Sequence, residues 1–386
     1  MNDLPRQKLK EIIIQHGHAL CDDPKRCEAF LRDYCGEYGR EIFILISVLK
    51  QGIVKDLLNS NNIPIELLLG RLTKQMQNNL GLTEEAARYG VESWAVVLDK
   101  MTLQPIETKS ATLRNKMRTF SFEVVSSNKE GKILNKKSVS ANYFVEDLGN
   151  GIILEMIEIP GGIFMMGSQE NEKDRNINEG PLHQVKISSF FMGKYLITQE
   201  QYYAIIGNNP SNFRGNKNPV EEVSWQNAVK FCQKLSQRTG KIYTLPSEAQ
   251  WEYACRSKTI TPFYFGDNIT TDLVNYNGNY PYGLASKEQW RKKTTEVGTF
   301  PPNAFGLYDM SGNLWEWCLD TWHNNYQGAP SDGSPWFSNS MIPRHVLRGG
   351  SWFNSAKDCR SASRNCNFDH GNDYGFRVVT APLLWN

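Results

Sequence analysis

The sequence lacks the features that mark several common classes of protein. Its 386 residues contain no apolar run of membrane-spanning length, and its N-terminus, MNDLPRQKLKEIII, mixes charged residues among the apolar ones. A formal net charge of only +2 does not indicate a surface for DNA or RNA. None of the eight cysteines forms a CxxC pair, which argues against a zinc knuckle or a redox dithiol. We therefore expect a cytoplasmic protein with reduced, mostly buried thiols and no nucleic-acid or membrane partner.

Tryptophan is nearly absent from the first half of the chain, where Trp94 is the only one of ten before position 200. The first hundred residues instead repeat apolar side chains at helical spacing. Pro24 fits the first turn of a helix that one of the preceding aspartates caps, and Thr83 can cap another. We expect a small all-α bundle over residues 1–100 that binds a protein partner. A polar, basic linker over residues 101–118 should follow it.

The pattern changes after this linker. FSFEVVSS, SANYFVEDLG and GIILEMIEIP have the composition of short strands separated by turns. Further on, two helices are clear among glycine, proline, asparagine and aromatic residues. One begins after Ser224 and ends before Gly240, and the other begins after Ser247 with Gln250 completing a capping box. Residues 119–386 should therefore form an α+β domain with long loops.

Seven stretches of this second half occur in an order that is specific to one family. They are IPGGIFMMGS at 159–168, FFMGKYLITQEQY at 190–202, NPVEEVSWQNAVKFC at 218–232, LPSEAQWEYACR at 245–256, PPNAFGLYDMSGNLWEWCLD at 301–320, RGGSW at 348–352 and GFRVV at 375–379. Together they resemble the formylglycine-generating-enzyme, or sulfatase-modifying factor, family. The resemblance spans roughly 155–380 and implies an irregular variant of the C-type lectin fold.

Arginines recur through the last of these stretches and the segment between them. A guanidinium can form two parallel hydrogen bonds with a carboxylate such as that of Glu316 or Asp320. Gly349 and Gly350 permit backbone geometry that other residues resist. We interpret most of the shared motifs as packing. The arginines concerned are Arg348, Arg360, Arg364 and Arg377.

The resemblance also raises the question of catalysis. Oxidases of the family bind copper(I) through two cysteines after the Gly-Gly-Ser-aromatic motif, and those positions are Asn354 and Cys359 here. An amide does not replace a thiolate toward copper(I), so we expect no copper and no catalysis, with Cys359 a core thiol. Cys366 lies too far along the chain to restore the pair. A related iron site would need a spaced histidine pattern, whereas His16 and His18 are two residues apart. The copper-dependent oxidase remains the alternative function.

A binding function explains the C-terminal segment better. The frame RGGSW…GFRVV also resembles variable proteins of diversity-generating retroelements, in which AAC codons become NNC codons. Between Phe353 and Tyr374, Lys357 is the only residue that NNC codons cannot encode. The alternative is an ordinary polar loop of a family member that is not diversified. We expect a protein or small-molecule ligand to contact Phe353, Asn354, Ser355, Lys357, Asp358, Ser363, Asn365, Asn367, Phe368, His370, Asn372, Asp373 and Tyr374, with Trp336 and Phe337 flanking the surface.

Calcium is a further implication of the resemblance, through the stretch YDMSGNLWEW. By register the ligands would be the carboxylates of Asp309 and Glu316 and the carbonyls of Gly312 and Leu314. Such a mixture of oxygen donors suits a structural Ca²⁺ ion. The alternative is that Asp309 and Glu316 cap turns or pair with arginines.

Overall fold

The computed structural model describes residues 4–59, 65–98, 117–338 and 343–381. The chain divides into two compact units, 1–109 and 110–386. Nearly all of the predicted linker lies outside the described residues, although Arg118 already begins the first strand. None of the described helices combines the length and the apolar character that a bilayer crossing requires.

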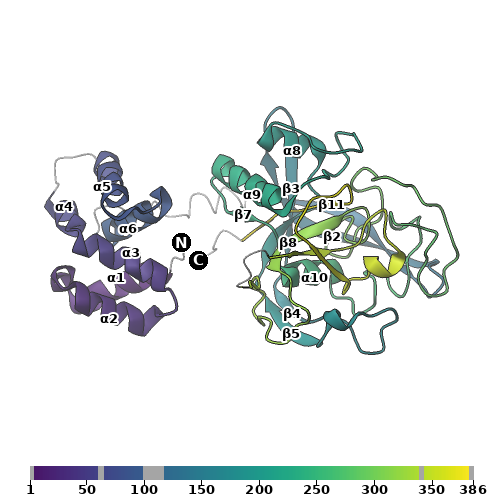
Figure 1. The fold of residues 1–386 in the computed structure, drawn as a ribbon, viewed down its shortest axis with the longest axis horizontal. Helices are drawn as coiled ribbons and strands as arrows, with labels where there is room; N and C mark the ends of the chain where they lie inside the picture. Colours follow the sequence, from purple (N-terminus) through teal and green to yellow (C-terminus); the bar gives the residue numbers. More distant parts are fainter. Residues whose placement is uncertain (1–3, 60–64, 99–116, 339–342, 382–386) are drawn as a thin grey trace. The chain divides into compact units, whose positions relative to one another are not determined.

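The first unit consists of helices around one buried apolar core (Figure 1). Asp23 accepts a hydrogen bond from the Arg26 N–H to cap the second helix, and Thr83 accepts one from the Ala86 N–H to cap the last. These caps were predicted, whereas the short helix α4 was not. The helices are α1 (Leu4–His16), η1 (His18–Asp22, 3₁₀), α2 (Pro24–Cys35), α3 (Gly39–Lys50), α4 (Ile53–Asn59), α5 (Ile65–Leu80) and α6 (Glu84–Val97).

The second unit mixes short strands, three longer helices and long loops, which confirms the predicted α+β class. Its strands are β1 (Arg118–Ser127), β2 (Ile133–Asp147), β3 (Ile153–Ile159), β4 (Gly162–Met166), β5 (His183–Ile187), β6 (Phe190–Gly193), β7 (Tyr243–Thr244), β8 (Trp315–Thr321), β9 (His345–Arg348), β10 (Arg364–Asn367), β11 (Tyr374–Gly375) and β12 (Val379–Thr380). The helices are η2 (Ile177–Glu179, 3₁₀), α8 (Gln199–Ile206), α9 (Trp225–Thr239), α10 (Glu248–Arg256) and η3 (Ala356–Cys359, 3₁₀).

The strands form three sheets. The largest has the order β1-β2-β3-β6-β12-β7, a second has the order β10-β9-β8-β11, and β4 pairs with β5 in the third. All the pairings are antiparallel except that of β8 with β11. The stretch from β9 to β12, which includes the C-terminal segment, therefore contributes strands to two sheets, and β9 and β11 hold the segment at its two ends.

The six-stranded sheet separates two buried cores because alternate side chains of a strand point to opposite faces. Met156 of β3 belongs to a cluster with Phe231 of α9, whereas its neighbour Ile157 belongs to a cluster with Trp251 of α10. Figure 1 shows α8 and α9 beside β3 and β7. Sheet and helices thus supply a rigid support for the loops.

Local sequence signals account for the ends of the helices. Ser224 accepts a hydrogen bond from the Asn227 N–H, and Gly240 ends α9 with φ 71°. Ser247 and Gln250 form the predicted capping box of α10. The helix α8 was not predicted, although Thr198 and Gln201 form a capping box there too.

Candidate functional site

A tight turn opens the C-terminal segment directly after β9. Gly349 and Gly350 have φ values of 98° and 74°, in the left-handed region that side chains with a Cβ resist. A Cβ added to Gly350 would come within 2.7 Å of the Cys359 thiol. The turn therefore brings the start of the segment against η3, and only glycine fits there.

Buried arginines hold the segment to α10. The guanidinium of Arg348 donates to Glu252 at 2.5 Å and to Glu248 at 3.2 Å. Arg364 donates two hydrogen bonds to the same Glu248, at 2.6 and 2.9 Å. These charges are almost fully enclosed, so each carboxylate must have its partner in place.

Two further arginines, Arg360 and Arg377, hold the middle and the end of the segment, and together with Arg348 and Arg364 we call them the frame arginines. Arg360 donates to both oxygens of Glu179, at 2.6 and 2.9 Å, and to Glu172 at 2.6 Å. Arg377 donates to both oxygens of Glu316, at 2.6 and 2.7 Å. The predicted pairing with Asp320 is wrong, because the Asp320 carboxylate accepts from the backbone N–H groups of Glu248 and Trp336 instead. Burial raises the pKa of Asp320 to about 7.

The exposure of the predicted contact residues varies along the segment. Phe353, Lys357, Phe368 and His370 are exposed. Half-buried positions are Asn354, Ser355, Asp358, Asn365, Asn367, Asn372, Asp373 and Tyr374. Ser363 is only 2% exposed, because it lies in the buried turn between two frame arginines, so its predicted place on the surface is wrong.

Several half-buried residues support the segment from inside. Asn354 Oδ1 accepts a hydrogen bond from the indole N–H of Trp315 at 2.8 Å, and Ser351 Oγ lies 2.5 Å from the same oxygen. Ser351 Oγ is also 3.2 Å from Asp373, whose carboxyl has its pKa raised by burial. Asn354 and Asp373 therefore help to join the two ends of the segment.

An aromatic cluster at the start of the segment includes residues that the sequence did not reveal. Phe353 is 56% exposed, and its ring lies 5.5 Å from Trp352 and 6.0 Å from Trp290. Phe213 packs edge-on against Trp352 at 5.3 Å, and Lys292 lies 5.2 Å from the Trp290 ring centre. The only sequence signal for Trp290 and Phe213 is their residue type, because both come from irregular loops.

His370 connects the far end of the segment to another loop. Its Nδ1 lies 2.5 Å from a carboxylate oxygen of Glu222, and this hydrogen bond raises the pKa of the imidazole. The backbone N–H of Glu222 donates to the carbonyl of Gly371 at 3.0 Å. By contrast, Trp336 stacks on His323, whose carbonyl accepts from Arg364. Trp336 is thus connected, through His323, to the buried Arg364.

The comparisons with known proteins agree with this architecture. Residues 149–382 match the family model of the sulfatase-modifying factor enzyme 1-like domain. The chain belongs to this family. The match lies within the second compact unit, beginning after β2, and confirms the predicted resemblance and the C-type lectin fold.

Three proteins that are similar to this chain carry names that indicate different functions. The chaperone protein LppX of Paenibacillus barcinonensis is 28% identical over 289 residues, 63% of this chain and 92% of LppX. The formylglycine-generating enzyme of Thermomonospora curvata is 25% identical over 296 residues, 59% of this chain and 94% of the enzyme. The solved structure of Treponema denticola variable protein 1 is 28% identical with a TM-score of 0.54, and the match covers 62% of this chain and 99% of that protein.

The copper site of the family's oxidases does not fit the residues of this domain. Asn354 occupies the first position, and its amide oxygen already accepts hydrogen bonds. Cys359 is fully buried, and burial raises the pKa of its thiol well above the ordinary value. The two positions thus supply a single thiol, whereas the copper(I) site that the resemblance implies uses a pair of them.

The surroundings of the predicted calcium ligands differ from one ligand to the next, and Asp309 Oδ1 is buried without a hydrogen-bond partner within the described part of the chain. Both oxygens of Glu316 accept hydrogen bonds from Arg377, and Oε2 accepts a further one from the Trp251 indole N–H, which is the arginine pairing that the sequence left as the alternative. Asp309 accepts from the Gly298 N–H with one oxygen, and burial raises its pKa to about 6. Among the described residues, no group of three or more histidine, cysteine, aspartate or glutamate side chains is placed to hold a metal. Gly312 donates its N–H to Gly349, and Leu314 is buried.

Proposed function

We propose that this chain is a non-catalytic binding protein whose segment 353–374 forms the ligand-binding surface. The observation that carries the proposal is the contrast within the segment. Its frame arginines are buried and paired, whereas Phe353, Lys357, Phe368 and His370 are exposed between them. Rigid aromatic rings next to small polar side chains are the composition of adaptable binding surfaces. The ligand is a protein or a small molecule that contacts this surface.

We further propose that a retroelement diversifies the segment. Its residues are those that mutated AAC codons encode, Lys357 excepted, and the similarity to a protein named variable protein supports the idea. Sequencing the DNA beside the gene tests it. The expected result is a near-copy of the coding segment that differs only at adenines, next to a reverse transcriptase gene. Absence of such a copy would contradict diversification and leave an ordinary binding loop.

The binding surface should tolerate substitution where its frame does not. Simultaneous replacement of Phe353, Lys357, Phe368 and His370 by serine should lower the melting temperature by no more than roughly 4–8 °C, because exposed substitutions typically change stability by about 0.5 kcal/mol or less each. The matched control is Ser363→Phe, a single change at a buried position. Equal destabilisation of the two variants would contradict the assignment of the surface.

The oxidase alternative is tested with the copper-loaded full chain and a cysteine-containing peptide that carries the sulfatase motif. We expect no aldehyde product by mass spectrometry. Turnover that Cys359→Ser abolishes would replace the binding proposal with the enzymatic one.

Two finer assignments complete the proposal. A cytoplasmic location is supported by eight free cysteines, seven of them buried. A protein partner for the helical unit is supported by the exposed aromatic rings of Tyr34 and Phe43. Fractionation of cells that express the full chain, and pull-down with Phe43→Ser as the comparison, test these two assignments.

A further inference from the structure

The strand β4 has one edge that no other strand covers in the described part of the chain. Its partner is β5, and Ile163 lies opposite Lys186 in the register. The Lys186 N–H donates to the carbonyl of Ser331 at 2.8 Å, so it points away from β4. In an antiparallel pair of strands, the backbone N–H and C=O groups of two directly opposite residues either all point toward the other strand or all point away from it. The N–H and C=O of Ile163 therefore point away from β5.

The same alternation applies two residues further along the strand. Met165 lies opposite Gln184, and its backbone groups point to the same free edge as those of Ile163. The side chains of Ile163 and Met165 are 62% and 45% exposed. The edge thus offers two pairs of backbone hydrogen-bonding groups, with aliphatic side chains beside them.

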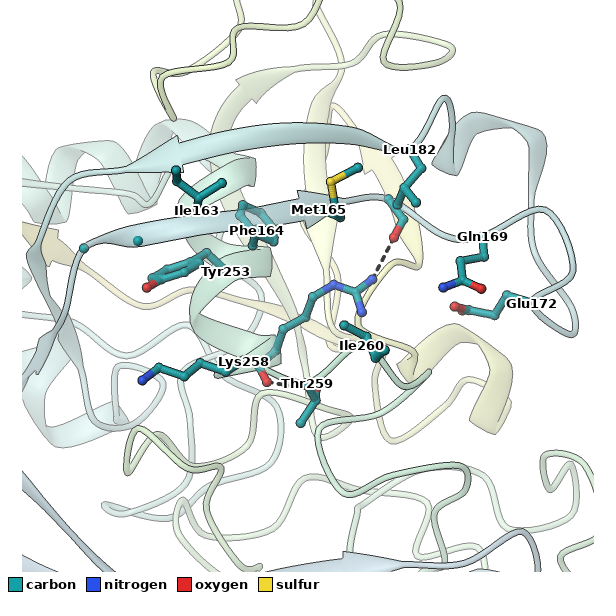
Figure 2. A pocket seen from close by; sticks show the side chains of 14 residues that line it. Ile163, Phe164, Met165, Gln169, Glu172, Leu182, Tyr253, Lys258, Thr259 and Ile260 are labelled. Carbon is teal, nitrogen blue, oxygen red and sulfur yellow. Dashed lines mark hydrogen bonds between the residues drawn. The ribbon is translucent and has the colours of Figure 1, made fainter.

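A cavity of about 460 Å³ runs along β4. Figure 2 shows Ile163, Phe164 and Met165 on one side of it and Lys258, Thr259 and Ile260 on the other. The cavity comes close to Tyr253, whose hydroxyl would lie 2.6 Å from a Cβ built on Gly162. A glycine at this position keeps the strand close to the aromatic ring.

The wall opposite β4 is held in a defined shape. Ser257 and Lys258 have φ values of 41° and 79°, a conformation that is costly for residues other than glycine. Thr259 Oγ1 donates to the carbonyl of Arg256 at 2.8 Å. The buried Arg256 guanidinium in turn donates to Glu252 and to the carbonyl of Gly167, each at 2.8 Å. The wall is therefore tied to both α10 and the end of β4.

We propose that an extended segment of a partner protein adds as a strand to the free edge of β4. An extended backbone supplies alternating N–H and C=O groups that can pair with those of the free edge, whereas the backbone groups of a helix already bond to one another. Apolar side chains at alternate positions would enter the cavity against Phe164 and Ile260. The exposed ammonium of Lys258 favours an acidic residue where the peptide passes it.

This strand-addition site is distinct from the proposed C-terminal binding surface. None of the residues that line the cavity belongs to segment 353–374. The two regions touch through Glu172, which lines the cavity and accepts a hydrogen bond from Arg360. Binding at β4 can therefore be tested without any assumption about the C-terminal surface.

The test uses the full chain and random seven-residue peptides displayed on phage. Selected peptides should alternate apolar and polar residues. A fluorescein-labelled synthetic copy should bind at least tenfold more weakly to Ile163→Lys than to the wild type. Ile133→Lys, which changes an exposed residue of β2 away from the cavity, is the matched control and should bind normally. Methylation of alternate backbone nitrogens of the peptide should abolish binding, because it removes the donors to the edge.

Three results would overturn the proposal. The first is a selection that yields no peptide sensitive to Ile163→Lys. The second is a selected peptide that binds equally well after N-methylation in either register, which would indicate a side-chain pocket without strand pairing. The third is concentration-dependent dimerisation of the chain that Ile163→Lys abolishes, which would make a second copy of this chain the occupant.

Discussion

Replacing Arg360 by methionine should destabilise the second unit strongly, because this side chain joins the C-terminal segment to the loop before β5. Its guanidinium donates to both oxygens of Glu179, to Glu172 and to the carbonyl of Asp174 at 2.9 Å. A fifth hydrogen bond reaches the carbonyl of Lys357 at 3.0 Å. Methionine keeps a similar apolar stem but can make none of these bonds.

The magnitude follows from burial. Glu179 is fully enclosed, and breaking a buried ion pair by removing one partner costs about 3–5 kcal/mol. A change of this size lowers the melting temperature of a large domain by roughly 6–20 °C. Burial favours a higher pKa for Glu179, but the hydrogen bonds and charge of Arg360 outweigh it and lower that pKa. This contribution is present above the unfolded pKa of about 4.3 and is lost as the pH falls, so Arg360→Met should cost more at neutral pH than in acid.

Urea denaturation followed by tryptophan fluorescence reports mainly on the unfolding of the second unit, because nine of the ten tryptophans lie beyond position 200. Arg118→Met, at an exposed position of β1, is the matched control and should change stability by no more than about 0.5 kcal/mol. A loss below about 1 kcal/mol for Arg360→Met, or an equal loss at pH 4 and pH 7, would refute the reasoning.

Three further predictions concern single groups. Glu222→Gln should lower the pKa of His370 in an NMR titration. The wild-type contact should contribute stability below about pH 6.5 and lose it as the pH rises through the raised pKa. Iodoacetamide should alkylate Cys366 before any other cysteine in peptide mass spectrometry, because the other seven are buried. Asp309→Asn should gain stability relative to the wild type between about pH 4 and 7 in urea denaturation, because burial raises the Asp309 pKa to about 6 and disfavours its ionised form.

Local signals in the sequence were enough to place much of the fold. The caps at Thr83, Ser224 and Ser247 are each decided within three residues of the helix start, so they could be predicted without tertiary contacts. The family motifs supplied the topology that local patterns do not contain. The helix α8 was not predicted despite its capping box, because the stretch at 190–202 was interpreted only as a family motif and not for its local helix signals.

Long-range pairing limited the prediction of the site. The buried arginines were identified, but the choice of Glu179 and Glu248 over Asp320 depends on which carboxylates the folded chain brings near them. Trp290 joins the aromatic surface from an irregular loop with no period to reveal it. Which edge of the β4–β5 pair is free depends in the same way on tertiary structure, because the loop at Ser331 bonds to the outer edge of β5.

The pattern of ion pairs explains how the C-terminal segment can vary without loss of the fold. Every frame arginine pairs with carboxylates that lie outside the segment, on α10, on η2 and its preceding loop, or on β8. The exposed side chains, by contrast, take no part in these pairs. Substitutions at Phe353 or Phe368 therefore leave every buried charge compensated, whereas the loss of one frame arginine exposes an enclosed carboxylate to a large desolvation cost. Stability thus resides in contacts that substitution of the exposed positions does not reach, and this separation supports the proposal of a binding surface at those positions.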